Sequence, residues 1–383
     1  MRSLSFRSTA RSAARLSGRL GARSASRSTA RSGARLAARS PARSAVVGLA
    51  AVLFFSAAIV TGARCQDQTT GAQKDKPQLQ KPNTAPDRPD HQDQQDQHQE
   101  PAIRLGTELV LLDVTVVDQS NKPVRDLSKE QFQVVEDKVP QKIDFFSREQ
   151  VPVSLVFTID TSGSMRPKLD TVIKASVNLV KSSQPGDEMA AIEFKDQPEL
   201  IEEFTSDMAD VIDALQGMVA SRQTAMFDAL YLAADYANKE GRNRRKAVIL
   251  VTDGLDNNSY YHFDEVVNHL RELDVQIYLI GFISDLSEEH SLFGKSDKEK
   301  AESVLNKLAA ETGGKAFFPR EPAEVHQIAQ QISTDLRTQY SIGYYPTNAK
   351  HDGSYRSVKV LVEGGSSRLV ARTRAGYTAP TKN

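Results

Sequence analysis

The chain has a single cysteine among its 383 residues, Cys65. One cysteine excludes both an intramolecular disulfide and a cysteine-rich zinc site. A protein with a large core does not need disulfides, so their absence is compatible with export from the cytoplasm. The length allows two domains and additional segments.

Acidic residues are absent from residues 1–64, which carry twelve arginines. The formal net charge of +0 is therefore the sum of a basic N-terminal segment and an acidic remainder. The rest of the chain holds all 49 Asp and Glu against 37 Lys and Arg, a net charge of about −12. Nucleic-acid binding needs a basic surface, so this charge argues against a nucleic-acid partner. It leaves open the binding of a metal, or of a carboxylate through a metal.

Residues 1–65 form an Arg-rich N-region that predicts an export signal. Arginine recurs at every fourth position from Arg7 to Arg43, and an uncharged apolar run follows from Ala45 to Ala63. A positive region, an apolar region and then small residues are typical of a secretory signal peptide. The run is also long enough to span a bilayer, so an uncleaved membrane anchor through residues 45–63 remains an alternative. In both cases we expect the folded part to be secreted, periplasmic or anchored outside the cytoplasm. The length of the Arg-rich region also leaves open a true start codon further downstream.

Residues 66–102 are rich in Gln, Asp, Lys and Pro and contain only isolated apolar residues such as Leu79. Such a segment cannot bury enough apolar surface to offset the entropy lost on ordering. We therefore predict a disordered linker that holds the folded part away from the membrane or the cleavage site.

Residues 151–337 alternate between two kinds of periodicity. Short apolar runs predict strands at Val153–Ile159, Met189–Phe194, Ala247–Thr252, Val275–Gly281 and Ala316–Phe318. Between them, apolar residues recur at helical spacing, as at Leu169, Val172 and Ile173. Nearly continuous apolar strands indicate that both faces of a parallel sheet are covered by helices. The expected fold class is α/β with a doubly wound sheet.

The flanking residues 103–150 and 338–378 contain strand-like segments without helices, followed by a tail at 379–383. Three expected strands on each side are too few for an independent sheet packing. In a doubly wound fold the first strand begins, and the last helix ends, at the same pole of the sheet. We therefore expect the two flanks to form one β-sandwich-like domain into which residues 151–337 are inserted.

Oxygen-bearing side chains cluster where the predicted strands end. Asp160, Ser162 and Ser164 follow the first strand, and Asp253 follows the strand that ends at Thr252. Ligands of such sheets bind beyond the carboxyl ends of the strands. Thr224, at the start of a helical stripe, can add another hydroxyl. Carboxylates and hydroxyls suit a hard cation such as Mg²⁺.

This pattern resembles the metal-ion-dependent adhesion site of von Willebrand factor type A (VWA) domains. The motif is Asp160-x-Ser162-x-Ser164, then Thr224, then Thr252-Asp253-Gly254. The resemblance implies a Rossmann-like VWA domain with Mg²⁺, or alternatively Mn²⁺ or Ca²⁺, bound directly or through water by these five residues. Segments of the flanks, such as Gln339–Tyr344 and Arg374–Tyr377, are similar to those of exported bacterial VWFA-related proteins. The chain departs from many relatives at Arg222-Gln223, where they have glycines.

The ligand set suggests a docking function. Two carboxylates and three neutral hydroxyls leave a divalent cation able to accept an Asp or Glu carboxylate from a protein partner in place of a water. Residues expected at the rim of that site are Asp256, Asn257, Tyr260 and Tyr261, although packing at a helix entry explains the tyrosines equally well.

Other functions remain as alternatives. The β-sandwich surface could be the working surface of a structural envelope protein, with the VWA domain as a spacer. A metal-dependent hydrolase is a further alternative, but the sequence has no nucleophile elbow, no phosphate-binding Gly-Lys loop and no evident general base. We therefore expect a binding protein and not an enzyme. His262 and His269 lack a third ligand, which argues against zinc.

Overall fold

The computed structural model describes residues 76–80, 108–221, 223–254, 256–288, 295–363 and 368–381. The predicted export signal and all of the predicted linker except residues 76–80 lie outside this part, as does Arg222. Within it, no helix is long and apolar enough to cross a bilayer. The apolar run Ala45–Ala63 lies outside the described residues.

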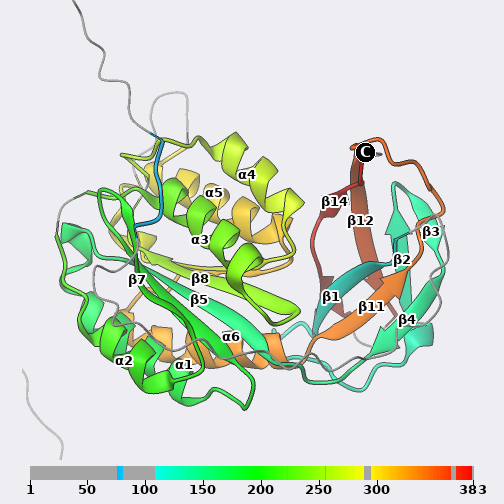
Figure 1. Ribbon diagram of the computed structural model, residues 1–383, viewed down its shortest axis with the longest axis horizontal. Helices are drawn as coiled ribbons and strands as arrows, with labels where there is room; N and C mark the ends of the chain where they lie inside the picture. Colours follow the sequence, from blue (N-terminus) through cyan, green and yellow to red (C-terminus); the bar gives the residue numbers. More distant parts are fainter. Residues whose placement is uncertain are drawn as a thin grey trace, which may run out of the picture. The chain divides into compact units, whose positions relative to one another are not determined.

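The centre of the α/β region is a six-stranded sheet (Figure 1). Its strands lie in the order β10-β9-β8-β5-β6-β7, and all neighbours pair in parallel except β6 and β7. Every residue of the central strand β5 is buried, as expected for a strand covered on both faces. The strands are β5 (Val153–Asp160), β6 (Glu188–Phe194), β7 (Pro198–Thr205), β8 (Arg245–Thr252), β9 (Gln276–Gly281) and β10 (Lys315–Phe317).

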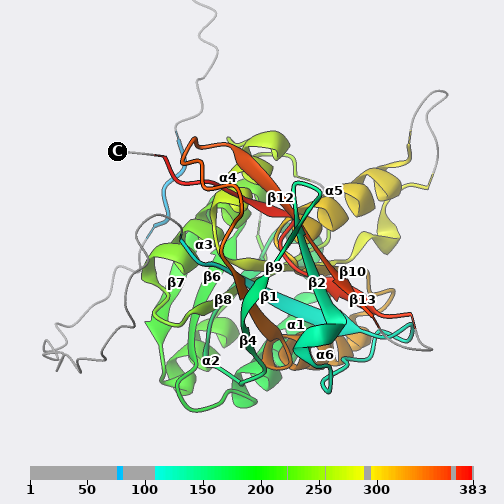
Figure 2. The same cartoon turned by 90° about the vertical axis from the view of Figure 1, so that its right-hand side faces the viewer.

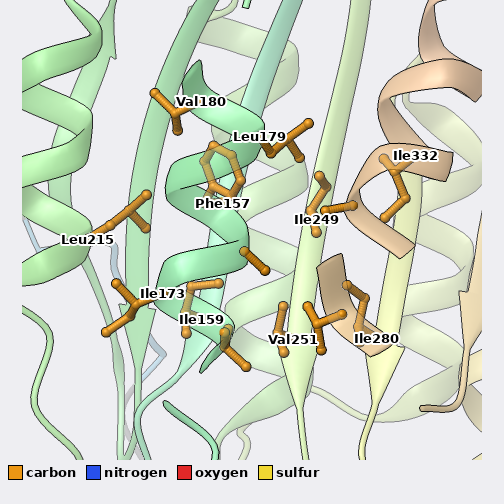
Figure 3. Packing of buried hydrophobic residues seen from close by; sticks show 14 of the residues in the cluster. Phe157, Ile159, Ile173, Leu179, Val180, Leu215, Ile249, Val251, Ile280 and Ile332 are labelled. Carbon is orange, nitrogen blue, oxygen red and sulfur yellow. The ribbon is translucent and has the colours of Figure 1, made fainter. Parts of the chain in front are cut away.

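Helices cover both faces of this sheet. One face packs against α1 (Leu169–Lys181), α2 (Met208–Gln216) and α6 (Val325–Arg337), and the other against α3 (Met226–Glu240), α4 (Phe263–Glu272) and α5 (Asp297–Glu311). Alternate residues of each strand serve the two faces: Phe157 and Ile159 join the first core, whereas Val156 joins the second. Figure 3 shows the first core between the sheet and α1. The predicted doubly wound fold is confirmed.

The flanks form two four-stranded antiparallel sheets, in the orders β13-β1-β11-β4 and β14-β12-β2-β3 (Figure 2). A separate core that includes Leu112, Val134 and Ile342 draws residues from both sheets. Each flank contributes four strands, one more than expected. They are β1 (Val110–Val117), β2 (Phe132–Glu136), β3 (Val139–Gln141), β4 (Ile143–Ser147), β11 (Tyr340–Tyr344), β12 (Tyr355–Val362), β13 (Val370–Arg372) and β14 (Gly376–Thr378).

The α/β region is inserted between these two sets of strands, as predicted. Strand β4, which precedes it, pairs directly with β11, which follows it, and Ser147 lies opposite Ser341. Asp187 links the two ends of the inserted region. Its carboxylate accepts hydrogen bonds from the Val153 amide at 3.0 Å and from the Arg337 guanidinium at 2.6 Å. The start of the first strand and the end of the last helix therefore meet at one pole.

One strand of the sheet is absent from the predicted set. Strand β7 follows a three-residue turn, Lys195–Gln197, and forms the antiparallel edge of the sheet. Its sequence is rich in glutamate and only part of it is buried, which hides the strand signal. Short 3-10 turns complete the fold: η1 (Lys129–Gln131), η2 (Gly163–Met165), η3 (Ile283–Asp285) and η4 (Pro322–Glu324).

Candidate metal site at the carboxyl end of the sheet

The loop after β5 brings three of the expected ligands together. Asp160 is the last residue of β5, and its Oδ1 accepts a hydrogen bond from the Ser162 amide at 2.8 Å. The η2 turn then reverses the chain at once, which sets the hydroxyl oxygens of Ser162 and Ser164 only 3.1 Å apart. Helix α1 begins at Leu169.

The loop after β8 adds the second carboxylate. Asp253 directly follows β8, and its Oδ1 accepts a hydrogen bond from the Ser164 hydroxyl at 2.8 Å. The Thr252 hydroxyl donates to Asp160 Oδ2 at 2.7 Å. Four of the five expected ligands therefore belong to one hydrogen-bonded cluster, drawn from the ends of two adjacent parallel strands.

Thr224, the fifth expected ligand, is buried on the segment that leads into α3. The segment is held beside the same loops: the Ser221 amide donates to the Thr161 carbonyl, and the Ala225 amide donates to the Lys195 carbonyl. The backbone of Thr224 exchanges hydrogen bonds with Asn257, at 3.4 and 3.3 Å. These hydrogen bonds hold the Thr224 segment beside the cluster. The hydrogen bonds that join the other four residues do not include the Thr224 hydroxyl.

Burial in the cluster disfavours the charged form of a carboxylate. Asp160 is fully buried, and this burial is the main reason that its pKa rises to about 6, with the nearby Asp253 charge adding to the rise. Hydrogen bonds from Thr252 and Ser162 lower the pKa but do not cancel the effect of burial. A buried carboxylate in this state is stabilised by a cation placed beside it.

A cation of the chain itself lies at this site, and sequence reasoning missed it. The Lys168 ammonium is 3.1 Å from Asp253 Oδ2 and 3.0 Å from Asp285 Oδ2 of η3. Burial acts to lower the pKa of Lys168, but the hydrogen bonds and charges of Asp285 and Asp253 outweigh it and raise that pKa. The only signal in the sequence is a lysine four residues after Ser164.

The expected rim residues divide into two kinds. Asp256 and Asn257 accept hydrogen bonds from the amides of Phe227 and Thr224, so both support the Thr224 segment. Tyr260 is 39% exposed, whereas Tyr261 is buried and stacks on Tyr231 with ring centroids 3.9 Å apart. Tyr261 therefore has a packing role, which the sequence analysis gave as the alternative to a position at the rim of the site.

The donors fit a hard divalent cation. Carboxylate and hydroxyl oxygens are the ligands that Mg²⁺, Mn²⁺ and Ca²⁺ prefer, and Asp160 is an ionisable oxygen donor in a buried position. Among the described residues, no group of three or more His, Cys, Asp or Glu side chains is placed to hold an ion. His269 instead stacks on Tyr231, with ring centroids 3.8 Å apart.

The fold and its site define the class of protein: a doubly wound α/β domain with an oxygen-lined cluster at the carboxyl ends of its strands. Residues 154–331 match the model of the von Willebrand factor type A domain family. Residues 154–331 are therefore a VWA domain, set between the strands of a β-sandwich. Comparison with curated proteins gave no match.

Solved structures with similarity to the chain include three bacterial proteins. The vWF domain of the pilus tip protein Mfa5 from Porphyromonas gingivalis is 25% identical, with a TM-score of 0.27, and the match covers 28% of this chain and 39% of that one. An aerotolerance-related membrane protein from Bacteroides fragilis is 19% identical, with a TM-score of 0.38, over 48% and 98% of the two chains. A von Willebrand factor type A protein from Catenulispora acidiphila is 13% identical, with a TM-score of 0.40, over 72% and 74%.

Proposed function

We propose that this protein is an exported binding module whose VWA domain docks a carboxylate of a protein partner on a divalent metal ion. The VWA domain at residues 154–331 supports protein interaction as the general role. The metal would be held by Asp160, Ser162, Ser164, Thr224 and Asp253, directly or through water. The observation that carries the proposal is the hydrogen-bonded cluster of Asp160, Ser162, Ser164 and Asp253 at the end of the sheet.

The donor set supports docking of an anion. Asp160 and Asp253 neutralise a divalent charge, and the serine and threonine hydroxyls add none, so a cation at this site retains affinity for one more anionic oxygen. Ser164 is exposed, whereas Asp160 is buried beneath it, so the cluster is open to solvent on the side of the serine. An Asp or Glu side chain of a partner has the charge and size to approach there.

Mg²⁺ is the proposed ion, and Mn²⁺ and Ca²⁺ are the alternatives that the same donors accept. Mg²⁺ demands short, octahedral oxygen coordination and keeps several waters, which suits a site built from few charged ligands. Comparison of the three ions by titration calorimetry would rank them. Tighter binding of Ca²⁺ than of Mg²⁺ would contradict the choice of Mg²⁺.

Substitution of Ser164 tests the site without disturbing the core. Because Ser164 is exposed, Ser164→Ala should fold normally but lose a ligand, and we expect at least a tenfold weaker Mg²⁺ affinity by calorimetry. The control is Asp170→Asn, an exposed carboxylate in the first turn of α1. Equal Mg²⁺ affinity in wild type and Ser164→Ala would contradict the proposed ligand set.

Partner binding tests the docking step. Capture from envelope extracts should depend on Mg²⁺, disappear with EDTA and fall sharply in Asp160→Ala. A partner that stays bound in EDTA would favour the β-sandwich surface as the binding site. We expect no turnover of phosphate or ester substrates, since the site offers ligands but no positioned general base.

The location outside the cytoplasm is part of the proposal. It rests on the Arg-rich segment and the apolar run at residues 45–63. N-terminal sequencing of the mature protein would distinguish cleavage of a signal from an anchor. Fractionation with cytoplasmic proteins would contradict both.

A further inference from the structure

The outer edge of β7 is partly covered by residues 76–80, a piece of the predicted linker. Gln80 forms a parallel bridge with Glu199, and the Leu200 amide donates to the Gln80 carbonyl at 2.8 Å. The Gln80 side chain also donates to Gln197 Oε1 at 3.0 Å. In Figure 1 this segment is the short blue stretch beside β7. An extended peptide that adds to a sheet edge in this way gains main-chain hydrogen bonds.

The segment also has a face directed at the protein. Pro77 and Leu79 are half-buried, whereas Lys76, Gln78 and Gln80 are exposed, which is the alternation of a strand with one covered side. Leu79 packs against the core shared by α3 and β7. Leu79, the one large aliphatic residue of the predicted linker, is therefore the residue that makes the apolar contact.

The segment lies along a groove between β7 and α3. The groove is lined by Pro77 and Leu79 of the segment, Leu200 from β7, Tyr231 and Tyr236 from α3, and Tyr261. The walls are fixed by their own contacts: Tyr236 stacks on Phe204 with centroids 5.2 Å apart, and its hydroxyl accepts a hydrogen bond from the Phe204 amide at 3.1 Å. The groove thus combines the outer edge of β7 with an aromatic wall, which suits an extended peptide.

We propose that the β7–α3 groove is a peptide-docking site for an extended segment with apolar residues at alternate positions, and that Lys76–Gln80 is its resident occupant. The docked segment divides the linker. Only residues 66–75 then separate the folded body from the predicted export segment, instead of residues 66–102. Because a chain spans at most about 3.5 Å per residue, the maximum reach falls from about 130 Å to about 35 Å. The proposal is independent of the metal site.

Hydrogen exchange of the full-length chain tests the contact. Leu79→Asp places a charge in the groove and should release the segment, so that the Leu200 amide, which donates to the Gln80 carbonyl, exchanges at least tenfold faster. Gln78→Asp adds the same charge on the exposed side of the segment and should exchange at the wild-type rates. Equal exchange rates of the Leu200 amide in all three proteins would overturn the proposal.

A peptide supplied in trans tests the groove itself. A fluorescent peptide with the sequence of residues 75–82 should bind Leu79→Asp, whose groove is vacated, and bind wild type at least tenfold more weakly because the resident segment competes. A tether acts at an effective concentration in the millimolar range, so peptide dissociation constants up to that range are sufficient. Failure of the peptide to bind Leu79→Asp at millimolar concentration would overturn the proposal. Unchanged Mg²⁺ affinity and thermal unfolding in Leu79→Asp would establish that the domain remains folded.

Discussion

Replacement of Asp160 by asparagine should make the metal-free protein more stable. Asp160 is fully buried, and its pKa of about 6 lies above the ordinary value of 3.8. A carboxyl group whose pKa is higher in the folded state favours folding when it is protonated and opposes folding once it ionises. The penalty therefore grows between about pH 4 and pH 6 and is complete at pH 7.5.

The size of the effect follows from the shift. About two pKa units correspond to about 3 kcal/mol at neutral pH, as an upper figure. Asparagine can keep both hydrogen bonds of Asp160: its Oδ1 can accept from the Ser162 amide, and its Nδ2 can donate to the Thr252 hydroxyl. We expect Asp160→Asn to be more stable by about 1–3 kcal/mol in EDTA at pH 7.5.

Urea unfolding in EDTA and in Mg²⁺ measures the free energy of unfolding without and with the metal. Wild type should gain about 2.7 kcal/mol when Mg²⁺ is present at 100 times its dissociation constant, whereas Asp160→Asn should gain almost nothing. The matched control is Asp187→Asn, because that buried carboxylate is already paired with Arg337, and its loss should destabilise the protein. The reasoning is refuted if Asp160→Asn is less stable than wild type in EDTA, or if both gain equally from Mg²⁺.

Three further substitutions test other parts of the structure. Lys168→Met removes a positive charge that contacts Asp253 and should tighten Mg²⁺ binding about fivefold in calorimetry, corresponding to about 1 kcal/mol; weaker binding would contradict competition by the lysine. Asp113→Ala leaves the buried Arg245 unpaired where the β-sandwich meets the VWA domain, so urea unfolding should show a loss of about 3–5 kcal/mol; a loss below 1 kcal/mol would contradict that role. Burial lowers the pKa of His269 despite the nearby Asp235, so wild type should lose stability as the pH falls below about 6.5. His269→Phe should keep the stack on Tyr231 and show a smaller loss over that range; an identical pH profile would exclude His269 as the cause.

Much of the fold could be predicted from the sequence because it depends on strongly buried strands. Runs such as Val153–Ile159 are apolar at five of seven positions, and both faces of β5 are covered as that pattern requires. Strand β7 could not be predicted in the same way. It is a partly buried edge strand with three glutamates among its eight residues, so its sequence resembles a loop.

The candidate site could also be predicted from the sequence only in part. The Asp-Ser-Ser turn and Asp253 lie at strand ends, where the order of elements alone determines that they meet. The position of Lys168 depends on the rotation of a long side chain toward Asp253 and Asp285, which no local pattern encodes. The contact of Leu79 with β7 depends on a partner more than a hundred residues away in the chain.

The most direct test of a shared cation is a crystal soaked in Mn²⁺ and measured at the manganese absorption edge. An anomalous peak within coordination distance of the side-chain oxygens of Ser162 and Ser164, with Asp160 and Asp253 beside it, is the predicted result. A peak elsewhere, or an intact Lys168–Asp253 contact with no peak at saturating Mn²⁺, would contradict the proposed metal site.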